Sequence, residues 1–143
     1  MRIEYSSIDT TTSVDDTIVH LPDTYRLRWV TSSLNDSAVI DTAQDEQDKF
    51  LIAAHNHQTK LQAWHEGKPL FTSVLTKQLI GPQKELAEYS WRDIAYQRYQ
   101  NECFVFRIWM SIPDSDVGQA AEIVIEKNGK YRSIKLLQER ATE

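Results

Sequence analysis

Length, composition and charge already exclude several classes of protein. The chain has 143 residues, of which 41% are hydrophobic and 26% are charged, with only four glycines and four prolines. This composition is typical of a folded protein and excludes a disordered or fibrous chain, and the length indicates one domain over residues 1–143, with a disordered polar tail from 138 to 143.

The sequence also lacks the features of secreted and membrane proteins. No apolar run approaches the about 20 residues that a membrane-spanning helix needs, and the first residues show no apolar run like that of a signal peptide. The single cysteine, Cys103, has no partner for an internal disulfide. We therefore expect a cytoplasmic protein that does not bind membranes.

The net charge of −5 is unevenly distributed along the chain. Between Asp9 and Asp48, nine acidic residues stand against two basic ones, whereas residues 72–143 hold ten of each. A segment with a charge of −7 repels phosphate groups and attracts a basic partner. We therefore expect no direct nucleic-acid binding.

The N-terminal third predicts one strand clearly. Residues 6–17 are rich in Ser, Thr and Asp and predict a loop, and the short apolar stretches at 3–5 and 17–21 are candidates for edge strands. Polar and apolar residues alternate from Tyr25 to Trp29, which predicts a half-buried strand with Leu27 and Trp29 facing the core.

Two helices are predicted in the middle of the chain. Thr42 to Asp45 has the spacing of a capping box, and Gly67 with Pro69 ends the pattern, so we expect a long helix over residues 43–66. Its apolar face would comprise residues at steps of three and four, namely Phe50, Ala54, His57, Leu61 and Trp64. Residues 70–80 are ambiguous and favour a strand. A second, shorter helix is expected from Pro82 towards Asn101, with Ala87, Trp91, Ile94 and Ala95 on one side.

The last third predicts strands. Residues 103–112 are nearly all apolar and predict a strand buried on both faces. Asn128-Gly129 predicts a two-residue hairpin turn. That turn would pair Ile125 with Arg132, Ile123 with Ile134, Ala121 with Leu136 and Glu122 with Lys135.

These elements predict an α+β fold, in which a mostly antiparallel sheet packs against one long and one shorter helix and the chain ends in a β-hairpin. The closing hairpin, residues 122–134, resembles the terminal hairpin of NTF2-like domains. The resemblance covers this hairpin only, and the N-terminal helices of that family are not evident. It implies a pocket between a helix and a curved sheet.

The sequence contains no motif for catalysis or cofactor binding. A GxSxG nucleophile motif and a Gly-rich phosphate loop are both missing. His55 and His57 are two residues apart, which on a helix places them on different faces, so no metal site is expected. Cys103 begins an apolar strand and is expected to be buried and inert. We therefore expect no enzyme, no cofactor and no metal.

The first functional hypothesis is a non-enzymatic inhibitor, of the immunity type or the phage anti-defence type, that blocks a basic nucleic-acid-handling protein through an acidic face. Its candidate contact residues are Asp36, Asp41, Asp45, Glu46 and Asp48. An alternative is a small-molecule-binding or NTF2-like enzymatic domain, with His57 as the polar group of its pocket. A further alternative is a structural or assembly subunit.

Overall fold

The computed structural model describes residues 2–19, 23–44, 46, 49–80, 89–112 and 118–137. This part of the chain consists of strands, with one short 3-10 helix. The elements are β1 (Ile3–Tyr5), β2 (Thr12–Val19), β3 (Tyr25–Ser33), β4 (Val39–Gln44), β5 (Lys49–Ala54), β6 (His57–His65), β7 (Lys68–Leu75), η1 (Lys77–Ile80), β8 (Ser90–Gln100), β9 (Cys103–Ser111), β10 (Gly118–Glu126) and β11 (Tyr131–Leu137).

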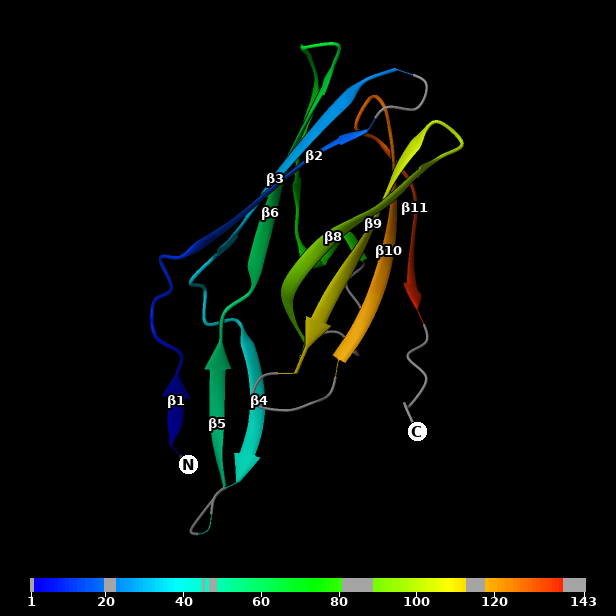
Figure 1. Cartoon of the computed structure of the whole chain (residues 1–143). Coiled ribbons are helices and arrows are strands. Elements are labelled where there is room, and N and C mark those ends of the chain that lie inside the picture. The colour runs from blue at the N-terminus through cyan, green and yellow to red at the C-terminus, as the bar shows by residue number, and fades with distance from the viewer. Residues whose placement is uncertain are drawn as a thin grey trace.

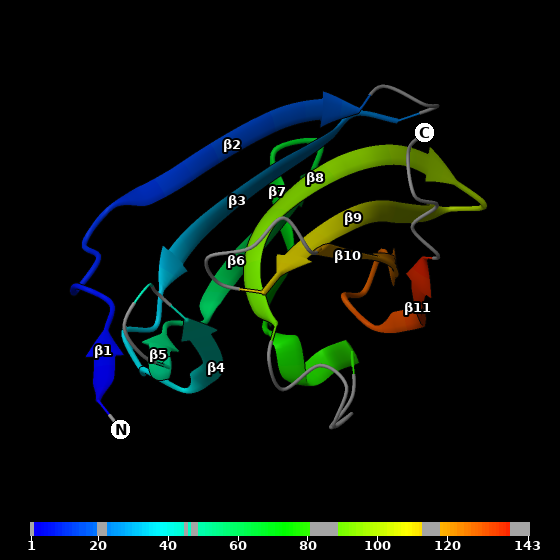
Figure 2. The same cartoon turned by 90° about the horizontal axis from the view of Figure 1, so that it is seen from below.

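The strands form two four-stranded antiparallel sheets and one smaller sheet. The four-stranded sheets have the strand orders β2-β3-β6-β7 and β11-β10-β9-β8, and the third sheet has the order β1-β5-β4, with β1 parallel to β5. Figure 2 shows the two larger sheets as two curved layers of a sandwich, and Figure 1 shows the third sheet extending from one end of it. Among the described residues, no helix has the length and apolar character needed to cross a membrane.

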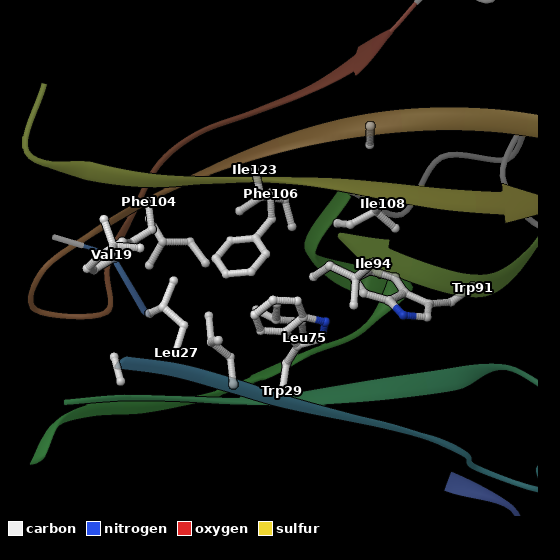
Figure 3. Packing of buried hydrophobic residues seen from close by; sticks show 14 of the residues in the cluster. Val19, Leu27, Trp29, Leu75, Trp91, Ile94, Phe104, Phe106, Ile108 and Ile123 are labelled. Carbon is white, nitrogen blue, oxygen red and sulfur yellow. The ribbon is translucent and has the colours of Figure 1, made fainter. Parts of the chain in front are cut away.

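The core lies between the two larger sheets. Leu27 and Trp29 of β3 point towards Phe104 and Phe106 of β9, as Figure 3 shows, and the Trp29 and Phe106 rings meet edge to face at 5.4 Å. Leu61, on the neighbouring strand β6, is fully buried in the same cluster. Burying these side chains from both layers supplies the hydrophobic stabilisation of the sandwich.

A nearly continuous strand connects the sandwich to the third sheet. β5 ends at Ala54 and β6 begins at His57, and the two residues between them, His55 and Asn56, are both buried. The chain therefore passes from one sheet to the other through a two-residue segment whose polar side chains are buried.

The long helix predicted over residues 43–66 is wrong. This segment contains β5 and β6, and the buried side chains in β6 alternate as Thr59, Leu61 and Ala63. The predicted helical face relied on Trp64, which is only partly buried and lies on the other side of the strand. Helix propensity is a weak preference, and pairing of β6 with β3 on one side and β7 on the other outweighs it here.

The second predicted helix is also wrong over its described part, because residues 90–100 form the edge strand β8; its first residues, 82–88, lie outside the described residues. Two β-bulges, at Trp91/Asp93 and Tyr96/Arg98, each insert one extra residue into this strand. Trp91 and Ile94 therefore face the core three residues apart, a spacing that imitates a helix. Ala95 is exposed, and Ala87 lies outside the described residues.

Several strand predictions are confirmed. Tyr25–Ser33 forms β3 with Leu27 and Trp29 buried, and Cys103 is buried at the start of β9. Residues 103–106 are buried on both faces, but Arg107 and Trp109 further along β9 are exposed. Residues 70–75 belong to β7, as favoured, whereas Lys77–Ile80 forms η1. The predicted loop at 6–17 is wrong in its second half, since β2 begins at Thr12.

The closing hairpin exists, but its turn is longer than predicted. The pairs Ala121–Leu136, Glu122–Lys135 and Ile123–Ile134 are confirmed, whereas Ile125 pairs with Tyr131 and not with Arg132. The N–H of Gly129 donates to the carbonyl of Glu126, and Gly129 has φ +87°. This is a three-residue loop with a left-handed glycine, which shifts the register by one residue next to the turn.

The fold is therefore an all-β sandwich with a small additional sheet, and the α+β prediction is corrected. The helices of an NTF2-like domain are not found in the described part of the chain. Residues 138–143, predicted to be a disordered tail, lie outside the described residues.

Candidate functional site

A polar cavity lies where the sandwich meets the β1-β5-β4 sheet, and we call it the junction pocket. Its volume is about 410 Å³, and its lining includes Glu4, Asp9, Ser33, His55 and His57. Two of these side chains carry carboxylates and two carry imidazoles. Such a lining suits a polar or cationic group better than an apolar one.

The walls of the junction pocket are held by hydrogen bonds between distant segments. The backbone N–H of Asp9 donates to the Asn35 side chain at 2.8 Å, and the Asn35 amide donates back to the Asp9 carbonyl at 3.0 Å. His55 Nδ1 accepts the N–H of Ser37 at 3.0 Å, so the proton lies on Nε2, which donates to the Ser7 carbonyl at 3.0 Å. His55 is therefore a structural residue that ties the β3–β4 connection to the segment after β1.

His57 is the titratable side chain of the junction pocket that contacts a carboxylate. Its Nε2 lies 3.8 Å from Oδ2 of Asp9, and its side chain is 17% exposed. The Thr11 hydroxyl donates to the same Asp9 carboxylate at 2.6 Å, and this bond holds the pKa of Asp9 below its usual value. The carboxylate therefore stays charged and favours a protonated imidazole or a cationic ligand beside it.

A second cavity, the edge groove, lies on the open side of the sandwich between strands β2 and β8. Its volume is about 420 Å³. It is lined by Ser13, Asp15 and Thr17 of β2, Trp29 of β3, and Asp93 to Tyr96 of β8. β2 and β8 are the edge strands of the two larger sheets, so the groove lies between two backbone edges.

The edge groove combines negative charge with an unsatisfied donor. Asp15 and Asp93 are exposed on opposite sheets, and neither forms an ion pair with a residue that the structure describes. Trp29 is only 5% exposed, and its indole N–H is buried without a hydrogen-bond partner in the described part of the chain. An unsatisfied buried N–H costs about 1–3 kcal/mol, which the hydrophobic packing of the sandwich has to offset.

Three of the five predicted contact residues, Asp36, Asp41 and Glu46, lie in the described part of the chain. The Asp36 carboxylate is exposed, but it accepts the backbone N–H groups of Asn56 at 3.0 Å and Ala38 at 3.3 Å, so it organises the β3–β4 connection. Asp41 lies on β4, and Glu46 is exposed between β4 and β5. Asp45 and Asp48 lie outside the described residues.

Sequence reasoning missed the edge groove. Asp15 was assigned to a loop and Asp93 to a helix, so nothing linked them. One signal was available: residues 13–19 are rich in β-branched side chains, which favour a strand, namely Val14, Thr17, Ile18 and Val19.

The comparisons with known proteins add no function to these two sites. No protein-family model and no curated protein sequence matches the chain.

Proposed function

We propose that the chain is a non-enzymatic protein-binding module that captures an extended, basic segment of a partner protein along β2 and in the edge groove. The observation that carries this proposal is the pair of exposed carboxylates, Asp15 and Asp93, that line the edge groove from opposite sheets beside the edge strand β2.

The backbone edge of β2 supports strand addition. β2 pairs with β3 through eight consecutive residues without a bulge, and its other edge faces no strand among the described residues. β8 across the groove is interrupted by two bulges, which protect an edge strand from pairing. A partner segment would therefore add to β2, where its main chain can continue the ladder of hydrogen bonds.

The exposed apolar side chains of β2 extend this contact surface. Val14 is 52% exposed and Ile18 is 55% exposed, both on the face of the sheet away from the core. On that face Asp16 is neutralised by Arg26, whose Nη2 lies 2.6 Å from Oδ2. The uncompensated charge therefore lies on the groove side, where it selects Lys or Arg side chains of the partner.

This proposal is a specific form of the inhibitor hypothesis, because both require a basic partner protein. A module that occupies a basic surface of a nucleic-acid-handling protein would block it, as an immunity-type or anti-defence protein does. It needs no cofactor and no catalytic residue. We place this interaction in the cytoplasm, in keeping with the single, buried Cys103.

The test begins with capture of the partner from host lysate at low and high salt, followed by titration of the purified partner. The double variant D15N+D93N removes two charges from the groove. In the wild type, the N–H of Ile94 donates to the Asp93 side chain at 2.8 Å, and D93N keeps an oxygen that can accept this hydrogen bond. We expect affinity to fall at least tenfold, a loss of about 1.4 kcal/mol. The partner should also bind more weakly at high salt.

The matched control is E46Q+E102Q, which removes the same charge from two other exposed positions. We expect it to bind like the wild type. Unchanged affinity of the groove variant would overturn the proposal. Loss of binding in the control alone would indicate that the partner contacts the acidic segment between Asp36 and Asp48 and not the groove.

The junction pocket supports a second candidate function, the binding of a small polar ligand beside His57. The supporting observation is the contact of His57 with Asp9 in a cavity of about 410 Å³. A thermal-shift screen of small amines and polar metabolites tests it. A ligand that raises the melting temperature of the wild type and not of H57F would support this function, and the same shift in both would exclude His57 from it.

A further inference from the structure

We propose that Asp23, His65 and Glu66 form a binding site for a single zinc ion, with the ligands His65 Nε2 and one oxygen of each carboxylate. These three ligand atoms all lie within 4.8 Å of one another. They are at the end of β6 away from the junction with β5, so the site is separate from the junction pocket. It does not depend on the proposed function.

The local fold positions the three residues independently of any ligand. β3 begins at Tyr25 and β6 ends at His65, and these two residues are paired in the ladder. One further rung follows, in which the N–H of Glu66 donates to the Thr24 carbonyl at 3.0 Å. Asp23 and Glu66 therefore flank a fixed pair of strand ends.

The imidazole of His65 and the carboxylate of Glu66 are both held in place. The His65 ring stacks on the buried Tyr25 ring at 4.7 Å with an interplanar angle of 20°. Glu66 has φ +49° in the turn to β7, and its Oε1 accepts the N–H of Thr24 at 3.0 Å. This bond uses one carboxylate oxygen and leaves the other for a metal.

The spacing between His65 and Asp23 fits two ligands of one metal ion. His65 Nε2 is buried from solvent and makes no hydrogen bond with a described residue, although Oδ2 of Asp23 lies only 3.4 Å away. Zinc binds imidazole nitrogen and carboxylate oxygen at about 2.0–2.2 Å, which in a tetrahedral site places two ligand atoms about 3.3–3.6 Å apart. The 3.4 Å between His65 Nε2 and Asp23 Oδ2 matches this spacing, and the Glu66 oxygen, within 4.8 Å of both atoms, completes the set after a small side-chain movement.

The ligand set favours zinc over calcium and magnesium, because those ions prefer oxygen ligands only. Asp23 and Glu66 are both exposed, so the carboxylate side of the site is open to water and a water molecule can take the fourth position of the metal. Three protein ligands and a water molecule are a common arrangement for zinc outside fully closed structural sites.

The test is calorimetric titration of the chelator-treated protein with zinc chloride, with cobalt chloride as a spectroscopic probe of four-coordinate geometry. The variant H65F keeps an aromatic ring on Tyr25 and removes the nitrogen. D23N removes one charged ligand, and E66Q removes another while it keeps the acceptor for Thr24. We expect one zinc ion per wild-type chain and at least tenfold weaker binding in each variant.

The controls are H57F, which changes the histidine of the junction pocket, and E102Q, which changes an exposed acid elsewhere. Circular dichroism without metal checks that every variant folds. Wild-type affinity in H65F, or no saturable zinc binding by the wild type, would overturn the proposal. Loss of binding in H57F with retention in H65F would also overturn it, since the metal would then lie in the junction pocket.

Discussion

The hydroxyl of Thr59 joins the two sheets of the sandwich, and its removal should destabilise the protein strongly. Thr59 of β6 is fully buried, and its Oγ1 accepts the indole N–H of Trp91 of β8 at 3.2 Å. The same oxygen lies 2.8 Å from Oγ1 of Thr31 of β3. The substitution T59V keeps the shape of the side chain and removes both interactions.

The expected cost follows from the groups that T59V leaves unsatisfied. The indole N–H of Trp91 is buried, and losing its acceptor costs about 1–3 kcal/mol. The Thr31 hydroxyl, also buried, adds a further cost of about 1 kcal/mol. The added methyl group offsets part of this loss, so we expect the free energy of unfolding to fall by about 2–3 kcal/mol.

Urea unfolding followed by fluorescence measures this free energy, and an unchanged m value would show that the unfolded state is not altered. The matched control is T72V, at an exposed position of β7, which should change stability by no more than about 0.5 kcal/mol. A double-mutant cycle with W91F isolates the indole contribution, since T59V should cost less when the N–H is already gone. A loss below about 0.5 kcal/mol for T59V would refute the assignment of an inter-sheet hydrogen bond.

Two further predictions concern the hairpin and the junction pocket. G129A should lower the free energy of unfolding by about 1–2 kcal/mol. Gly129 has φ +87°, and an added Cβ would lie 3.1 Å from the Phe71 side chain. A urea unfolding curve equal to that of the wild type would contradict the left-handed turn. T11V should raise the pKa of Asp9 towards its usual value, because the Thr11 hydroxyl lowers that pKa by hydrogen bonding to the carboxylate. A carboxyl whose pKa is lower in the folded state stabilises the fold above its unfolded pKa of about 3.9 and loses that contribution as pH falls through the folded pKa. The pH-dependent part of the stability difference between wild type and T11V should therefore decrease as pH falls below about 4 and disappear only below the folded pKa of Asp9. An unchanged Asp9 pKa by NMR titration would contradict this account.

Some elements could be predicted because their signals are local. Strand β3 was found from the alternation around Leu27 and Trp29, since a strand places every second side chain in the core. The closing hairpin was found from Asn128-Gly129, because turn formation depends on the conformational freedom of those two residues. The shift of register at Ile125 escaped prediction, since Asn-Gly also fits a two-residue turn.

The central segments could not be assigned locally. Residues 43–66 have apolar side chains at both helical and strand spacings, and only pairing with β3 and β7 selects the strand. In β8, the two bulges place Trp91 and Ile94 on one face at a helical spacing. Bulges depend on the partner strand, so sequence periodicity alone misreads them.

The sequence by itself determined a folded chain with a negatively charged first half, one buried cysteine, strand β3 and the closing hairpin. These features depend on composition and on the conformational preferences of residues that are adjacent in the sequence. Only the tertiary structure decided which carboxylates share a cavity or cluster. Asp15 and Asp93 are distant in sequence and line the edge groove from opposite sheets. Asp23 lies far before His65 and Glu66 and joins them because β3 pairs with β6. Such sites arise from long-range strand pairing, which depends on the packing of the whole core and not on any one segment.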